Sequence, residues 1–135
     1  MCIRDSFSSG STGEPKAILN SFENIYENAL SHAEAIGLRE DDVIGCALPL
    51  YYSYGLVANL LSGLIVKASI SLTNLNTSFN EQWFDANRVS VVALTPYFAK
   101  DKVIKSPSLR VMTLGGDALT IESANTIRNL SLIHI

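Results

Sequence analysis

The residues best suited to chemistry stand near the start of the chain, in the run Phe7-Ser8-Ser9-Gly10-Ser11-Thr12-Gly13-Glu14-Pro15-Lys16. Glycines let the main chain approach a ligand closely, and successive amide N–H groups in such a loop form a concave site for anionic oxygens. The serine and threonine hydroxyls add donors, and Lys16 adds a compact positive charge that suits a phosphate. We therefore predict that this run is a loop that binds a polyphosphate.

The sequence around Lys16 differs from the Walker loop, in which the lysine leads straight into a helix. Here Pro15 precedes Lys16 and favours extended backbone at Glu14. The residues that follow, Ala17 to Leu19, read as a strand. A flexible linker is the alternative interpretation of a Ser/Gly-rich run, but a linker does not account for the ordered Thr-Gly-x-Pro-Lys ending.

The run resembles the phosphate-loop signature of the adenylate-forming superfamily, which includes acyl-CoA synthetases, luciferases and the adenylation domains of peptide synthetases. That signature is an aromatic residue followed by [ST]-S-G-[ST]-T-G-x-P-K, and every position matches here. The resemblance implies catalytic roles for Thr12 and Lys16. The residues that it assigns to the phosphates of ATP are Ser8, Ser9, Gly10, Ser11, Thr12, Gly13 and Lys16.

A second informative segment, Pro49 to Leu56, follows a predicted buried strand over Val43–Leu48 and contains three tyrosines. Open α/β sheets bind ligands at this end of their strands, although an aromatic core corner fits the spacing equally well. The segment is similar to the family's P-L-[FY]-H-x-x-G segment, which borders the acid pocket. The resemblance implies that the substrate-binding residues are Tyr52, Tyr54 and Gly55.

Tyr52 stands where the family usually has histidine. Tyrosine is neutral at pH 7 and can donate a hydrogen bond to a carboxylate, but it cannot carry a positive charge as imidazolium does. We therefore keep the pocket assignment and drop any role for a titrating histidine at this position.

A third segment begins with Gly115-Gly116, after a predicted strand over Leu109–Leu114. Taken alone, it reads as a tight strand-to-helix turn. It resembles the family's G-G-x-x-L segment, where main chain without Cβ passes against the adenine ring. The resemblance implies that Gly115, Gly116, Asp117 and Ala118 bind the nucleotide, and Asp117 departs from the usual small residue.

Alternating strands and helices must position these segments. The predicted strands span 17–19, 43–48, 68–72, 89–94 and 109–114, and the predicted helices span 22–36, 56–66, 78–87, 97–104 and 121–128. Ser78 begins the third helix as a capping box, with Trp83 and Phe84 facing the core. This alternation favours an α/β fold, a mostly parallel sheet with flanking helices. The resemblance makes it part of the N-terminal domain of an adenylate-forming enzyme.

The first of these helices carries an apolar stripe at helical spacing, formed by Phe22, Ile25, Ala29, Ala33 and Ile36. Gly37 fits its C-terminal stop. His32 lies off the stripe, so we expect a solvated residue there. Arg39–Asp42 reads as a charged turn that follows.

The two ends of the chain, Met1–Ser6 and Leu130–Ile135, can be encoded by inverted copies of one short DNA, similar to the transposon end used in sequencing libraries. We expect residues 1–6 and 130–135 to be scars, and residues 7–129 to be a native fragment. Cys46 then has no disulfide partner, as in a reducing cytoplasm, where we expect this protein. We expect no metal site in this stretch.

The net charge of −3 offers no basic surface for nucleic acid. The apolar run Leu56–Val66 is too short for a membrane span. We therefore expect small-molecule partners, and the resemblance names ATP and a carboxylic acid.

The resemblance also implies the reaction. A carboxylate attacks the α-phosphate of ATP to give an acyl-adenylate and pyrophosphate, with Mg²⁺ shielding the phosphates. Coenzyme A, or the phosphopantetheine of a carrier protein, then takes the acyl group. We expect the fragment itself to be inactive because other family segments would lie beyond residue 129. The alternatives are an amino-acid adenylation domain that loads a carrier protein and a nucleotide-binding module without catalysis.

Overall fold

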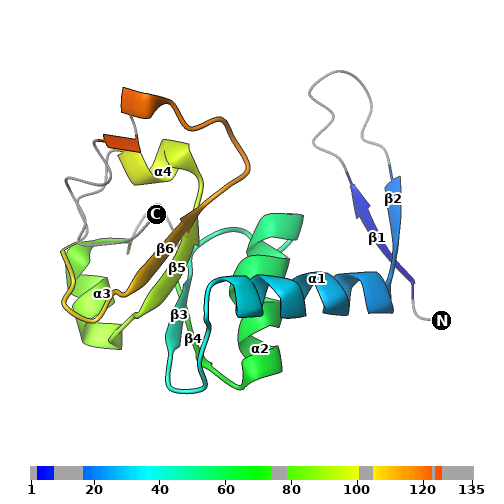
Figure 1. Ribbon diagram of the computed structural model, residues 1–135, viewed down its shortest axis with the longest axis horizontal. Coiled ribbons are helices and arrows are strands. Elements are labelled where there is room, and N and C mark those ends of the chain that lie inside the picture. The colour runs from blue at the N-terminus through cyan, green and yellow to red at the C-terminus, as the bar shows by residue number, and fades with distance from the viewer. Residues whose placement is uncertain (1–2, 8–16, 74–78, 101–104, 123, 126–135) are drawn as a thin grey trace.

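The computed structural model describes residues 3–7, 17–73, 79–122 without 101–104, and 124–125. The elements, in chain order, are β1 (Ile3–Phe7), β2 (Ala17–Ser21), α1 (Phe22–Ala35), β3 (Val43–Cys46), η1 (Gly55–Leu61), α2 (Ser62–Val66), β4 (Ser69–Leu72), α3 (Glu81–Asn87), β5 (Val91–Leu94), α4 (Pro96–Lys100) and β6 (Val111–Leu114) (Figure 1). The predicted strands are present, with ends that differ by up to two residues. Of the helix predicted over 121–128, residues 121, 122, 124 and 125 are described and are helical, and the other four lie outside the described residues.

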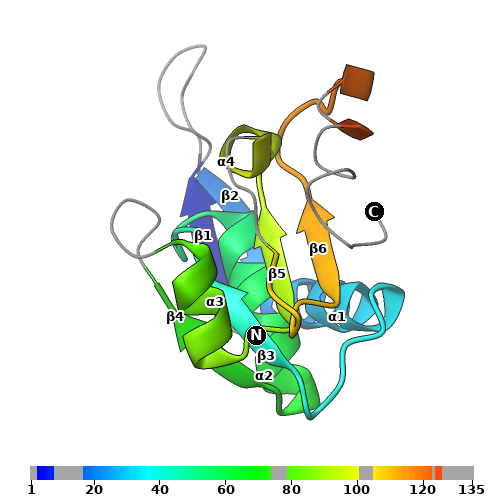
Figure 2. The ribbon, with the colours of Figure 1, turned by 90° about the vertical axis from the view of Figure 1, so that its left-hand side faces the viewer.

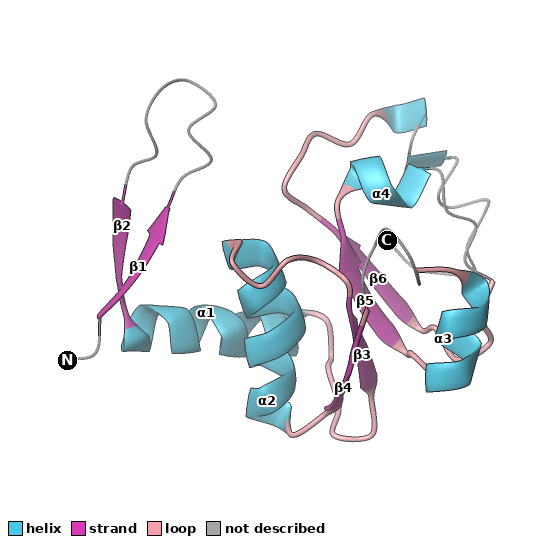
Figure 3. Cartoon of the chain, turned by 180° about the vertical axis from the view of Figure 1, so that it is seen from behind, coloured by secondary structure: helices cyan, strands magenta, loops and turns pink. Residues whose placement is uncertain are grey.

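Four strands form a parallel sheet in the order β4-β3-β5-β6. Helical segments connect successive strands, as parallel pairing requires. Helices α1 and α2 lie on one face of this sheet and α3 lies on the other (Figure 3). The predicted α/β fold with a mostly parallel sheet is therefore confirmed.

Each face of the sheet carries its own apolar core. One core includes Phe84, Val92, Leu94, Ala99 and Met112, and the other includes Ile44, Ala68 and Val91. Neighbouring residues of β5 thus point to opposite faces, and all four of its residues are buried. A strand covered on both faces needs a continuous apolar run, which explains why this segment was predictable. Phe84 is fully buried as predicted, and Trp83 packs half-buried beside it.

The first two strands form a separate antiparallel hairpin, whose register pairs Phe7 with Ala17. The hairpin contacts α1 and stands apart from the parallel sheet in Figure 1. Strand β1 includes Ile3 to Ser6, which we predicted to be part of a scar. The division of the chain at residues 6 and 129 stays a prediction.

Helix α1 begins and ends where its sequence indicates. The Ser21 hydroxyl accepts a hydrogen bond from the Asn24 amide at 3.1 Å, and Gly37 adopts φ +59° just beyond the helix. The apolar stripe was only partly right, because Phe22 is 66% exposed whereas Ala29 and Ala33 are buried. The first turn of α1 extends past the sheet toward the hairpin (Figure 1), and the ring that stacks on Phe22 is that of Tyr26, itself 42% exposed.

His32 is not the solvated residue that we predicted. Its ring is half-buried, and its Nε2 atom is buried without a hydrogen-bond partner among the described residues. Ala29 and Ala33 have short side chains, so the helices that pack on α1 approach closely and partly cover the neighbouring residue. Desolvation lowers the pKa of His32.

Two further helical predictions need correction. The run predicted as one buried helix is π-helical over η1 and α-helical over α2, and it ends at Lys67 in the left-handed region, φ +62°. Helix α3 is capped by Asn80, whose side chain accepts from the Trp83 amide at 2.9 Å, and not by Ser78. Asn80 directly precedes the helix and is as good an N-cap as serine.

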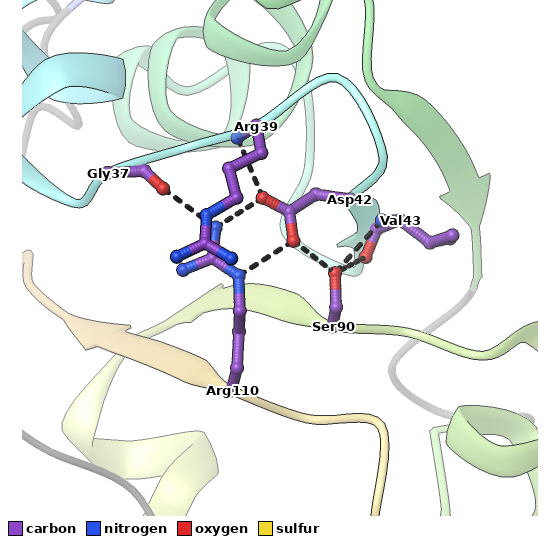
Figure 4. Close-up of polar contacts among 6 residues, drawn as sticks. All are labelled: Gly37, Arg39, Asp42, Val43, Ser90 and Arg110. Atoms are coloured by element: carbon purple, nitrogen blue, oxygen red, sulfur yellow. Dashed lines mark hydrogen bonds and ion pairs between the residues drawn. The ribbon is translucent and has the colours of Figure 1, made fainter.

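The turn before β3 is more than a charged surface, because Asp42 is only 4% exposed. Its carboxylate accepts hydrogen bonds from the Ser90 hydroxyl at 2.7 Å, from Arg110 Nε at 2.8 Å and from the Arg39 amide at 2.8 Å (Figure 4). Arg110 also donates to the Gly37 carbonyl at 2.8 Å. These residues precede β3, β5 and β6, so the network joins the amino ends of three strands.

The same network fixes the charge of Asp42. Burial by itself would raise the pKa of this carboxyl group, but the hydrogen bonds from Arg110 and Ser90 outweigh it and leave the pKa lower than usual. Asp42 is therefore ionised and paired in the folded protein.

Candidate nucleotide and acid site

The predicted phosphate loop, residues 8–16, lies outside the described residues. The structure instead describes the two strands that bound it. Strand β1 ends at Phe7, β2 begins at Ala17, and these two residues are paired Cα partners. The loop thus starts and finishes at one place on an antiparallel hairpin. A Walker loop, in contrast, passes from a strand into a helix.

The strand ends that matter for the site point the same way. The carboxyl ends of β3, β5 and β6 and the Phe7 end of β1 point toward the same side of the molecule in both views (Figures 1 and 2). Strands β3, β5 and β6 are also neighbours in the sheet. The segments that follow β3 and β6 are therefore close enough to meet.

Those two segments are in direct contact. The Tyr54 hydroxyl, from the segment after β3, lies 3.1 Å from the Thr113 hydroxyl on β6. A Cβ atom placed on Gly115 would lie 3.1 Å from Cζ of Tyr54. The absence of a side chain at Gly115 lets the tyrosine ring lie against main chain. The predicted acid segment and the predicted adenine segment thus form one surface.

The turn after β6 is held on its other side by β5. The Gly115 amide donates to the Leu94 carbonyl at 3.1 Å. Gly116 has φ +83°, a conformation that glycine adopts at little cost, and a Cβ there would lie 3.6 Å from Cγ2 of Thr95. The main chain at Gly115 and Gly116 is therefore fixed between residues that follow β3 and β5.

Beyond that turn the chain is open to solvent. Gly116, Asp117 and Ala118 are exposed. The Asp117 carboxylate accepts a hydrogen bond from the Ala118 amide at 2.7 Å, so this side chain stabilises the local main chain. An exposed strip of main chain at the carboxyl edge of a parallel sheet is a suitable surface for a flat ring.

The tyrosines of the acid segment lie in different surroundings. Tyr51 and Tyr52 are 73% and 49% exposed, with ring centroids 4.4 Å apart. Tyr54 is half-buried, and burial raises its pKa although the hydrogen bond with Thr113 acts the other way. Gly55 is buried, and a Cβ there would lie only 2.5 Å from the Pro49 carbonyl oxygen, so η1 can begin at this place only with glycine.

The sequence profile described as "AMP-binding enzyme" matches residues 6–133. The chain belongs to the AMP-binding enzyme family. This confirms both the predicted family and the assignment to part of the N-terminal domain of an adenylate-forming enzyme.

Comparison with known members of the family agrees with the fold. The chain is 35% identical to a 2-succinylbenzoate–CoA ligase of Bacillus licheniformis over 82% of this chain and 24% of the ligase. It is 30% identical to a nonribosomal peptide synthetase of Emericella nidulans over 84% of this chain and 7% of the synthetase. O-succinylbenzoate coenzyme A synthetase from Bacillus subtilis, in complex with ATP and magnesium ion, superposes with a TM-score of 0.77 at 24% identity, covering 93% of this chain and 27% of that one. The chain thus spans about a quarter of the length of such ligases.

Sequence reasoning within this AMP-binding chain missed Thr95 and Thr113. Thr113 contacts the Tyr54 hydroxyl, and the Thr95 methyl group lies on the side of Gly116 where a side chain would stand. A signal was available, since Thr113 is the polar residue of the β6 sequence Val-Met-Thr-Leu. A polar side chain in an otherwise apolar strand needs a hydrogen-bond partner where it is covered.

The described residues can be searched for groups that would hold a metal ion and for helices that would cross a membrane. They contain no group of three or more His, Cys, Asp or Glu side chains that could hold a metal ion. Cys46 is a free and buried thiol, and burial raises its pKa. Within the same residues, every helix is too short or too polar to cross a lipid bilayer.

Proposed function

We propose that the full-length protein containing this chain activates a carboxylic acid with ATP and then transfers the acyl group to coenzyme A. The observation that carries this proposal is the contact of Tyr54 with Thr113 and Gly115, since it joins the acid segment to the adenine segment at the carboxyl edge of the sheet. Family membership and the CoA-ligase relatives support the same reaction.

The proposed roles follow the order of the segments. Residues 8–13 and Lys16 bind the phosphates, with Thr12 and Lys16 acting as the catalytic residues. Tyr52, Tyr54 and Gly55 border the acid, and Gly115 to Ala118 pass against adenine. A carboxylate oxygen attacks the α-phosphorus, the bond to the bridging oxygen of pyrophosphate breaks, and an acyl-adenylate forms. The protein contributes mainly position and charge stabilisation to this step.

Magnesium, when bound, neutralises charge on the triphosphate. The described residues offer no cluster of ligands for it. We propose that Mg²⁺ would bind together with ATP, since this ion is usually held by substrate phosphates and one or two carboxylates, and that the carboxylate belongs to a segment beyond residue 129. An enzyme that uses ATP and coenzyme A is expected to work in the cytoplasm.

The proposal is tested by incubating the full-length protein with ATP, Mg²⁺, coenzyme A and single acids, and by analysing the products by mass spectrometry. The first acid is 2-succinylbenzoate, because a relative is named for it. We expect AMP, pyrophosphate and a CoA thioester to appear together. Hydrolysis of ATP to ADP and phosphate, or thioester formation without AMP, would contradict the proposal.

A second candidate is an amino-acid adenylation domain that loads a carrier protein, which the match to a nonribosomal peptide synthetase favours. The two candidates differ in acid and acceptor. The second candidate predicts adenylation that depends on an amino acid. It also predicts that the acyl group is loaded onto a phosphopantetheine arm and not onto free coenzyme A. Observation of both would favour the amino-acid adenylation domain.

A further inference from the structure

We propose that Tyr54 is a positioning residue for the nucleotide, acting through Thr113 and the glycine turn and not through a hydrogen bond from its own hydroxyl to the acid. This inference rests on the proposed function. It assigns Tyr52 and Tyr54, which the sequence groups together as acid-binding residues, to different tasks.

The Tyr54 hydroxyl already has a hydrogen-bond partner on β6. Tyr54 Oη and Thr113 Oγ1 are 3.1 Å apart, and the tyrosine ring is half-buried. The ring is therefore held at its far end by β6 and at its near end by the main chain just before η1. Tyr52 contacts the neighbouring Tyr51 ring, which is itself 73% exposed, and at 49% exposure Tyr52 is more open than Tyr54.

The Tyr54 ring also lies against the main chain of the turn at Gly115. A Cβ on Gly115 would lie 3.1, 3.3 and 3.4 Å from Cζ, Oη and Cε1 of Tyr54. These distances mean that the ring edge occupies the space beside the Gly115 main chain. On its other side the Gly115 amide is bound to the Leu94 carbonyl at 3.1 Å. A change in ring position therefore shifts the strip of main chain that we assign to adenine.

Thr113 belongs to the strand that leads into the turn at Gly115. It lies on β6 two positions before Gly115, so the hydrogen bond ties the ring to the strand that leads into the turn. A hydroxyl that serves only the acid would not require a partner on that strand. The Tyr54–Thr113 pair thus ties the start of η1 to the strand that leads into the nucleotide segment.

The test uses four variants of the full-length protein: Tyr54→Phe, Thr113→Val, the double variant and Thr113→Ser. We expect each single variant to weaken ATP binding by about 3- to 10-fold, the effect of one neutral hydrogen bond. The double variant should be no worse than either single variant, because both remove the same interaction. Thr113→Ser keeps the hydroxyl and should restore binding, and KM for the acid should change by less than about twofold.

A matched control is Thr73→Val. Thr73 follows β4 at the same edge of the sheet, and its hydroxyl is buried without a hydrogen-bond partner among the described residues. This substitution makes the same chemical change as Thr113→Val, and we expect it to leave ATP binding unchanged.

Three results would overturn the inference. Tyr54→Phe could raise KM for the acid while Thr113→Val does not, which would mean a direct contact with the acid. The variants could lower the melting temperature and leave ATP binding unchanged, which would mean a purely structural contact. The two effects could also be additive. ATP affinity measured by calorimetry does not require turnover, so these outcomes decide the inference even if the proposed ligase reaction is not found.

Discussion

Tyr52 and Tyr54 are close in sequence, yet only one of them has a side chain that is open to a substrate. Tyr52 is 49% exposed, whereas Tyr54 lies half-buried against Gly115 with its hydroxyl beside Thr113. We therefore propose that Tyr52 contacts the acid and that Tyr54 fixes the geometry of the nucleotide segment. Each assignment leads to a substitution with a distinct signature.

The substitution Tyr52→His tests the acid side. It places a group with an ordinary pKa near 6.5 where the protein has a neutral hydroxyl. Below that pH the imidazolium should attract a carboxylate, so we expect KM for the acid to fall by about 3- to 10-fold between pH 8 and pH 5.5 relative to the parent protein. The measurement is the acid dependence of ATP–pyrophosphate exchange across pH. Tyr52→Phe is the control, and identical profiles for Tyr52→His and Tyr52→Phe would contradict the assignment.

The substitution Gly115→Ala tests the nucleotide side. Its new methyl group would lie 3.1 Å from Cζ of Tyr54, so the ring or the turn must move by a few tenths of an ångström. We expect ATP affinity to fall by about 10-fold, as for overpacking that costs roughly 1–3 kcal/mol. Calorimetric titration with ATP measures this. In a Tyr54→Leu background the alanine should add little, and a full additional loss there would show that Tyr54 is not the obstacle.

At the element scale, the network around Asp42 joins the amino ends of three strands and leaves their carboxyl ends to the site. Asp42 precedes β3, Ser90 precedes β5 and Arg110 precedes β6 (Figure 4). The network lies at the edge opposite the tyrosine and glycine segments, so its expected contribution is to stability and to the spacing of the strands.

We expect Asp42→Asn to destabilise the protein by about 2–3 kcal/mol, because it leaves Arg110 without its charged partner. Asp42 has a lowered pKa in the folded state, so its contribution is present above the unfolded pKa near 4 and is lost as pH falls through the folded value. The gap between the parent and the variant in urea unfolding should therefore narrow below about pH 4. The neighbouring, exposed Asp41 provides the control, Asp41→Asn, and equal losses for both variants would contradict this role.

The elements that could be predicted well from the sequence are those set by residues close to one another in the chain. The strand predicted over 89–94 and the Gly37 stop depend on neighbours in the chain, and the structure has both. The Asp42–Arg110 pair spans 68 residues, so no local pattern indicates it. The contact of Tyr54 with Gly115 likewise depends on the order of β3, β5 and β6, which the alternation of strands and helices leaves open. The family resemblance located both segments, but only the three-dimensional structure shows that they are in contact.

At the scale of the whole molecule, several large apolar side chains of the described residues are exposed. On the hairpin and the start of α1, four apolar or aromatic side chains are between 42% and 68% exposed: Ile18, Leu19, Phe22 and Tyr26. Ile18 and Leu19 follow one another in β2, so apolar side chains are exposed on both faces of the hairpin. The chain spans about a quarter of its ligase relatives, and we expect further parts of the full-length protein to cover these side chains.

We therefore expect the 135-residue chain by itself to form no acyl-adenylate and to associate in solution. Light scattering and a fluorescent apolar probe measure the association, with the full-length protein as the control. Acid-dependent formation of acyl-adenylate by the isolated chain would contradict this expectation.

Whether the full-length protein forms an acyl-adenylate can be measured by the exchange of radiolabelled pyrophosphate into ATP, with and without a carboxylic acid. We expect exchange that requires the acid and Mg²⁺, and that falls by at least about 10-fold in Lys16→Ala, because that substitution removes a positive charge from the proposed phosphate loop. Tight ATP binding with no exchange for any acid, or exchange that Lys16→Ala leaves unchanged, would contradict the proposed function.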